Sequence, residues 1–100
     1  MDKNTGEFWA IIGFDENKAR NIAKNIEEKA EKNMVFAYYC RREIYIKLQD
    51  DTIIRWFPNA NKARGYRYSK LICDSEIDLE TLNNIILPQY LGDYDDIVWL

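Results

Sequence analysis

The hydrophobic positions near the N-terminus predict a buried strand followed by an amphipathic helix. Residues 7–14 (EFWAIIGF) form a nearly continuous apolar run, which is typical of a strand buried on both faces of a sheet. Apolar residues then recur at steps of three and four from Ala19 to Ala30. This spacing predicts a helix over residues 16–32 with one apolar face, and Asp15 stands where its side chain can cap the first turn.

The middle of the chain has the pattern of strands joined by tight turns. In the segment EIYIKLQ, three aliphatic residues alternate with Tyr45 and Lys47, which is the period of a strand with one buried face. The Asp50-Asp51 pair that follows indicates a turn and therefore a hairpin. The segments predicted as strands in this region are residues 34–40, 43–49, 52–57 and 69–74.

The last part of the chain predicts a second helix and a short terminal strand. Asp78 can cap a helix over residues 79–87, and Pro88 should end that helix. The apolar residues 97–100 are expected to form a last strand against the core.

The order of these elements predicts an α/β fold, with α+β as the alternative. We expect one small domain over residues 1–100, in the order strand, helix, four strands, helix, strand. Its central mixed sheet should have about five to six strands, with the two helices on one or both faces. Residues 1–6 are expected to be a flexible tail.

Composition narrows the class of protein. No apolar run approaches the roughly 20 residues of a membrane span, and the N-terminus lacks a basic segment followed by an apolar one, so we expect a cytoplasmic protein without a membrane partner. The chain has two cysteines and no histidine, which argues against zinc sites and imidazole-based catalysis. We therefore expect no enzyme activity and no cofactor, with Cys40 and Cys73 as small buried apolar residues.

Charge is divided unevenly along the chain. Residues 1–33 sum to −1, residues 41–70 to +5 and residues 71–100 to −7, which gives the net charge of −3. The basic middle favours an anionic ligand, whereas the acidic end favours a basic partner. Two solvated faces of opposite charge are the simpler interpretation of the same pattern.

One segment resembles a known family. Residues 50–77 (DDTIIRWFPNANKARGYRYSKLICDSEI) resemble a segment in the ATPase domain of phage terminase large subunits, the motors that package DNA. The resemblance lies in a hairpin strand, a loop with Arg-Gly-Tyr-Arg and an apolar strand that ends in an acid, and it covers about half of the chain. It implies that Asp74 corresponds to the magnesium-binding acid of the Walker B motif, and that Arg64 to Arg67 form the turn before it.

The same segment departs from the family at the catalytic positions. Ser75 stands where the family has its second acid, and Glu76 comes one position late. The four glycines are isolated, so no phosphate-binding loop of the P-loop type is present. The resemblance therefore implies a relative that does not hydrolyse ATP, and a magnesium ion shared by Asp15 and Asp74 is the weaker metal hypothesis.

A nucleic-acid-binding surface is an alternative interpretation of the same region. The segment RGYRYSKL partly matches the RNP1 strand of RNA-recognition motifs, in which aromatic side chains stack on bases and arginines neutralise phosphates. The candidate residues of this surface are Arg41, Arg42, Arg55, Lys62, Arg64, Tyr66, Arg67 and Tyr68.

A protein-binding acidic face is the function that the sequence favours. The terminase-like segment suggests a phage or mobile-element protein, and an acidic face can occupy a basic groove meant for DNA. We therefore expect a non-enzymatic protein that binds a macromolecular partner, acting as an anti-defence inhibitor or adaptor of DNA-handling machinery. The candidate contact residues are Asp74, Glu76, Asp78, Glu80, Asp93, Tyr94, Asp95 and Asp96.

Overall fold

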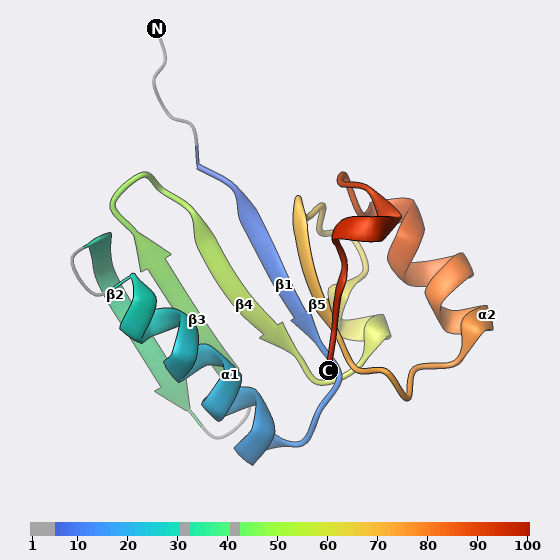
Figure 1. Cartoon of the computed structure of the whole chain (residues 1–100), viewed down its shortest axis with the longest axis horizontal. Coiled ribbons are helices and arrows are strands. Elements are labelled where there is room, and N and C mark those ends of the chain that lie inside the picture. The colour runs from blue at the N-terminus through green and yellow to red at the C-terminus, as the bar shows by residue number, and fades with distance from the viewer. Residues whose placement is uncertain (1–5, 31–32, 41–42) are drawn as a thin grey trace, which may run out of the picture.

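The computed structural model describes residues 6–30, 33–40 and 43–100, which form one mixed six-stranded sheet with helical segments (Figure 1). The strands are β1 (Phe8–Ile12), β2 (Met34–Cys40), β3 (Glu43–Leu48), β4 (Ile53–Phe57), β5 (Lys70–Cys73) and β6 (Val98–Trp99). The helical elements are α1 (Glu16–Lys29), the 3-10 turn η2 (Ala60–Ala63), α2 (Leu79–Thr81), the π-helical η3 (Leu82–Ile86), and the 3-10 turns η4 (Leu87–Gln89) and η5 (Tyr94–Asp96).

The sheet has the strand order β2-β3-β4-β1-β5-β6. β1 runs parallel to β4 and β5, and β5 runs parallel to β6, whereas β3 is antiparallel to both β2 and β4. This arrangement confirms the mixed α/β fold with six strands. β1 lies between two parallel neighbours, and its residues Ala10, Ile11 and Ile12 are fully buried, which explains the continuous apolar run in the sequence.

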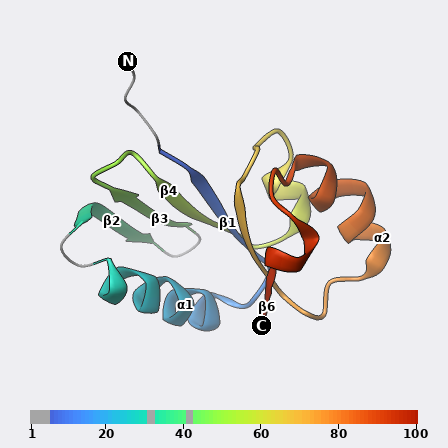
Figure 2. The ribbon, with the colours of Figure 1, turned by 45° about the horizontal axis from the view of Figure 1, so that its top comes forward.

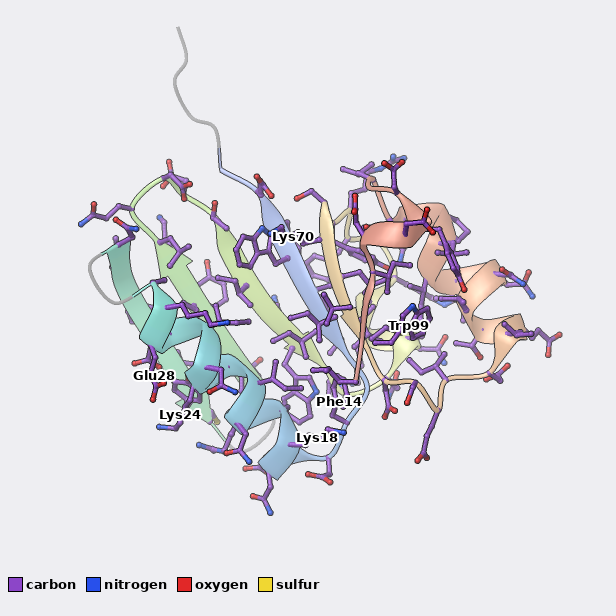
Figure 3. All side chains as sticks on the ribbon, viewed as in Figure 1. Phe14, Lys18, Lys24, Glu28, Lys70 and Trp99 are labelled. Atoms are coloured by element: carbon purple, nitrogen blue, oxygen red, sulfur yellow. The ribbon has the colours of Figure 1, made fainter. Side chains whose placement is uncertain are left out.

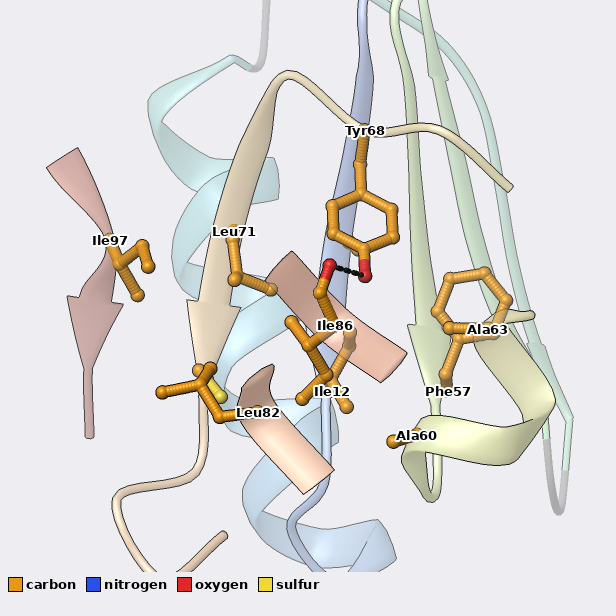
Figure 4. Packing of buried hydrophobic residues seen from close by; sticks show 11 residues of the cluster. Ile12, Phe57, Ala60, Ala63, Tyr68, Leu71, Leu82, Ile86 and Ile97 are labelled. Atoms are coloured by element: carbon orange, nitrogen blue, oxygen red, sulfur yellow. Dashed lines mark hydrogen bonds between the residues drawn. The ribbon is translucent and has the colours of Figure 1, made fainter. Parts of the chain in front are cut away.

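The two helical layers cover different halves of the sheet on opposite faces. α1 packs on the β2-β3-β4 half, where Ile44, Ile46 and Ile54 are buried beneath it (Figures 1 and 2). The segment from α2 to η4 packs with η2 on the other face over β1 and β5, where it buries Ile12 and Leu71 (Figure 4). The face of β2 and β3 that points away from α1, with the adjoining part of β4 around Arg55, therefore has no helical layer among the described residues, whereas Phe57 at the end of β4 packs against η2.

The first helix begins where the sequence predicts. Asp15 has an extended backbone, and its Oδ1 accepts a hydrogen bond of 2.8 Å from the N–H of Lys18, so the predicted N-cap is confirmed. The helix ends at Lys29, earlier than the expected residue 32; residues 31 and 32 lie outside the described part of the chain.

The second helix is not the single helix over 79–87 that the sequence predicts. The α-helical part ends at Thr81, a wider π-helical segment follows, and Pro88 lies inside the 3-10 turn η4 instead of ending the helix. Proline is tolerated there because the first turn of a helical segment does not use its missing N–H. The Tyr68 hydroxyl donates a 2.9 Å hydrogen bond to the Ile86 carbonyl and ties this segment to the sheet (Figure 4).

The turn between β1 and α1 has an unusual backbone, which side chains from β4 and from the end of β5 hold in place. Gly13 and Phe14 have φ angles of +96° and +72°. The buried indole of Trp56 donates to the Gly13 carbonyl at 2.6 Å, and the Phe14 N–H donates to Asp74 Oδ2 at 3.1 Å. The carboxylate of Asp74 therefore joins the end of β5 to the start of α1.

The two cysteines lie on different parts of the sheet. Cys40 is half-buried on β2 and Cys73 is buried on β5, four strand positions away, which corresponds to about 19 Å. Burial, followed by the nearby charge of Asp74, raises the pKa of the Cys73 thiol to about 12. Cys73 is therefore the small buried residue that the sequence suggests, whereas Cys40 is only partly covered.

Candidate binding surface on the uncovered face of the sheet

The uncovered half of the sheet carries aromatic and charged side chains. Tyr38 on β2 pairs with Tyr45 on β3, and Tyr45 pairs with Arg55 on β4, so these three side chains form a row across the strands. Their neighbours along each strand point to the opposite face, under α1. We call this surface the open face and define it by the residues Phe36, Tyr38, Glu43, Tyr45, Lys47, Arg55 and Tyr66.

Two aromatic rings on β2 are strongly exposed. Phe36 is 49% exposed and Tyr38 is 44% exposed. Their rings are nearly parallel, with an interplanar angle of 8° and centroids 6.5 Å apart, and the rings of Tyr45 and Phe36 meet edge to face with centroids 6.2 Å apart. Large exposed aromatic groups in one cluster are typical of a surface that contacts a partner.

An arginine lies at the inner border of these rings. The Arg55 guanidinium lies 5.3 Å from the ring centroid of Tyr66 and 5.6 Å from that of Phe57, and its Nη1 donates to the Tyr66 hydroxyl at 3.2 Å. The Tyr66 ring is stacked 5.5 Å from Phe8. These contacts fix a half-exposed positive charge beside a flat aromatic surface.

Two hollows adjoin this arginine. The first, about 260 Å³, is lined by side chains of β2 and β3 together with Arg55. The second, about 570 Å³, extends past the end of β4 and adds Lys62 to the lining. Glu43 lines both hollows, so this end of the surface carries both signs of charge.

The structure separates the residues of the predicted basic aromatic surface. Tyr66 and Arg55 lie together, but Tyr68 is fully buried and its hydroxyl is bonded to Ile86, so its ring is not available to stack on a base. Arg64 is exposed and donates from Nε to Asn61 at 2.9 Å. Lys62 and Arg67 are exposed, whereas Arg41 and Arg42 lie outside the described residues.

Five residues of the open face were missed by the sequence-based prediction of the site, namely Phe36, Tyr38, Glu43, Tyr45 and Lys47. The alternation of residues 43–49 separates Tyr45 and Lys47 from the buried aliphatic positions. It could not show that their side of the sheet has no helical layer. That fact depends on the strand order, which places β2 and β3 away from the α2 segment.

The predicted acidic residues between β5 and α2 partly serve the local structure. Asp74 accepts from the N–H groups of Phe14 and Glu76, at 3.1 and 3.0 Å. Asp78 caps α2 as predicted, and the hydrogen bonds from the Thr81 side chain and backbone lower its carboxyl pKa. Glu76 and Glu80 are exposed.

The second acidic group lies in η5 and at Asp93, the residue before it. Asp93, Tyr94, Asp95 and Asp96 are all exposed, and the centroid of the Tyr94 ring lies 6.3 Å from that of Trp99, which is labelled in Figure 3. Burial, with a further contribution from the charges of Asp96 and Asp93, raises the pKa of Tyr90. These acids are accessible to a partner, as the acidic-face hypothesis requires.

Asp74 and Asp15 lie at the ends of neighbouring strands, as the magnesium hypothesis requires. Each carboxylate already accepts a backbone hydrogen bond, and no group of three or more metal-ligating residues occurs in the described part of the chain. A hollow of about 350 Å³ adjoins Asp74, Glu76 and Asp78 and is lined by no lysine or arginine. This acidic lining disfavours phosphate, and the resemblance to the Walker B region stays a prediction.

In comparisons with known proteins, no family model matches the chain, and no curated protein or solved structure matches it either. Among the described residues, no helix is both long and apolar enough to cross a membrane.

Proposed function

We propose that this protein is a non-enzymatic binding protein that holds single-stranded nucleic acid on the open face. The observation that carries this proposal is the row of Tyr38, Tyr45 and Arg55 across three strands, with Phe36 beside it. Aromatic side chains on a sheet stack on unpaired bases, and each such contact contributes about 1–3 kcal/mol with little dependence on base identity. A duplex does not offer its base faces in this way, so single strands are the preferred ligand.

The charges near the open face predict only a modest affinity for nucleic acid. Arg55 and Lys62 are available to phosphates near the open face, whereas Lys47 lies 3.6 Å from the carboxylate of Asp51. The protein has a net charge of −3, so long-range attraction of a polyanion is weak. Stacking should therefore supply more of the binding free energy than phosphate contacts do.

Titration of a fluorescently labelled single strand, followed by anisotropy at several salt concentrations, tests this proposal. We expect saturable binding that is stronger for the single strand than for a duplex of the same length. Arg55→Gln should weaken binding and lower the slope of log K against log salt by about 0.7, the value for one lost contact to a single-stranded phosphate. Arg67→Gln removes the same charge from the neighbouring loop and serves as the control. If Arg55→Gln and Arg67→Gln give the same slope of log K against log salt, Arg55 does not contact the phosphates and the proposal is contradicted. Absence of binding by the unchanged protein would contradict it as well.

An acidic face that binds a basic protein is the second candidate function. Asp93, Asp95 and Asp96 are exposed at and just before η5, and they belong to a stretch, residues 71–100, with seven acids and no base, which supports this function. In this alternative the chain is an inhibitor or adaptor of DNA-handling machinery from a phage or mobile element. Failure of every nucleic acid to bind would favour it over the open face.

A further inference from the structure

We propose that β2 pairs antiparallel with β2 of a second copy, so that two chains form a dimer with one continuous sheet. This inference depends on the fold and is independent of the proposed function. β2 lies at the end of the strand order, so one of its edges has no neighbouring strand within the six-stranded sheet. An open strand edge presents backbone donors and acceptors that can pair with another chain.

The composition of β2 favours such pairing. Its seven residues (MVFAYYC) include no charged residue and no proline, the two residue types that most often protect a strand edge. A register shift between Met34 and Phe36 disturbs one end, but the pairing from Phe36 to Cys40 is regular. The opposite edge of the sheet is protected because its edge strand, β6, is short and has only two residues.

Exposed apolar side chains accompany this open edge. Val35 is 59% exposed, and Phe36 and Tyr38 are also among the exposed large hydrophobic residues. A second strand beside β2 would cover part of these side chains and bury the backbone groups at the same time. Pairing would also bring Phe36 and Tyr38 of the two copies together and extend the open face across the dimer.

The charges beside β2 fit a second copy of the same chain. Lys24 lies 5.1 Å above the ring of Tyr39, so this flank of α1 lies over β2. Lys24 and Glu28, one turn apart with opposite charge, extend from α1 on that flank (Figure 3). A two-fold axis between two such helices places Lys24 of each copy toward Glu28 of the other, which is the self-complementarity that a symmetric dimer requires.

Sedimentation velocity over a concentration series, without nucleic acid, tests this inference. We expect the unchanged protein to form a dimer, and Val35→Lys to raise the dissociation constant of the dimer at least about tenfold, which corresponds to about 1.4 kcal/mol. Leu91→Lys is a matched control, since Leu91 is 60% exposed and lies far from β2 in the sequence. Circular dichroism shows whether both variants are folded.

A charge exchange on α1 tests whether the two copies meet across a two-fold axis. Lys24→Glu should weaken the dimer because it places a second carboxylate opposite Glu28 of the other copy. The double variant Lys24→Glu with Glu28→Lys restores opposite charges across the axis and should restore the dimer. A monomer at every concentration, equal effects of Val35→Lys and Leu91→Lys, or no restoration in the double variant would overturn the inference. Binding of nucleic acid by a monomer would leave the proposed function intact.

Discussion

Replacement of Phe36 and Tyr38 by serine is expected to weaken the binding of single-stranded nucleic acid at least about thirtyfold. Each ring contributes about 1 kcal/mol or more when a base stacks on it, and about 2 kcal/mol corresponds to this factor. Both side chains are nearly half exposed, so their loss removes little core packing. Anisotropy titration measures the affinity, and thermal unfolding should show little change in stability.

The matched control for this pair removes equally apolar side chains elsewhere. Leu79 and Leu91 are 70% and 60% exposed, and neither belongs to the open face. The double variant Leu79→Ser with Leu91→Ser should therefore keep the affinity of the unchanged protein. If both double variants bind alike, the aromatic rings do not hold the ligand.

Gly13→Ala is expected to destabilise the protein by about 2–3 kcal/mol. Two effects combine: the φ angle of +96° disfavours any residue with a Cβ, and an added Cβ would lie 2.6 Å from the Cβ of Asp74. The Asp74 side chain cannot move away without losing its hydrogen bond from the Phe14 N–H. Thermal unfolding measures the change, and for a chain of this length a loss of this size lowers Tm by roughly 10 °C or more.

Gly65→Ala separates the two effects. Gly65 has a similar φ of +90°, but an added Cβ would have no atom within 4 Å. This variant should therefore lose only about 1 kcal/mol, from backbone strain alone. If both variants lose the same stability, the contact between the turn and Asp74 does not contribute.

The sequence predicted the local elements well where one pattern dominated. The strand over residues 34–40 has the same bounds in the structure, and α1 begins after the predicted cap Asp15. The second helix was predicted less well because Pro88 was interpreted as the end of one regular helix. In the structure, packing of Leu82 and Ile86 on the sheet holds a π-helical segment there, and Pro88 lies in the turn that follows.

The candidate site could be predicted only in part, since it depends on contacts distant in the sequence. Tyr66 and Tyr68 are equivalent in the sequence pattern, yet one borders the open face and the other lies in the core. The difference arises because Tyr68 bridges to Tyr90 and bonds to Ile86, partners that no local pattern identifies. Likewise, the exposure of Phe36 and Tyr38 follows from the place of β2 at the sheet edge.

Photochemical cross-linking of a single strand containing 5-bromouracil, followed by peptide mass spectrometry, tests most directly whether the open face holds nucleic acid. Bases stacked on β2 and β3 should give adducts on Phe36, Tyr38 or Tyr45, and a competing unlabelled single strand should suppress them. Adducts confined to Tyr94 and Trp99, with none on β2 or β3, would contradict the proposed function.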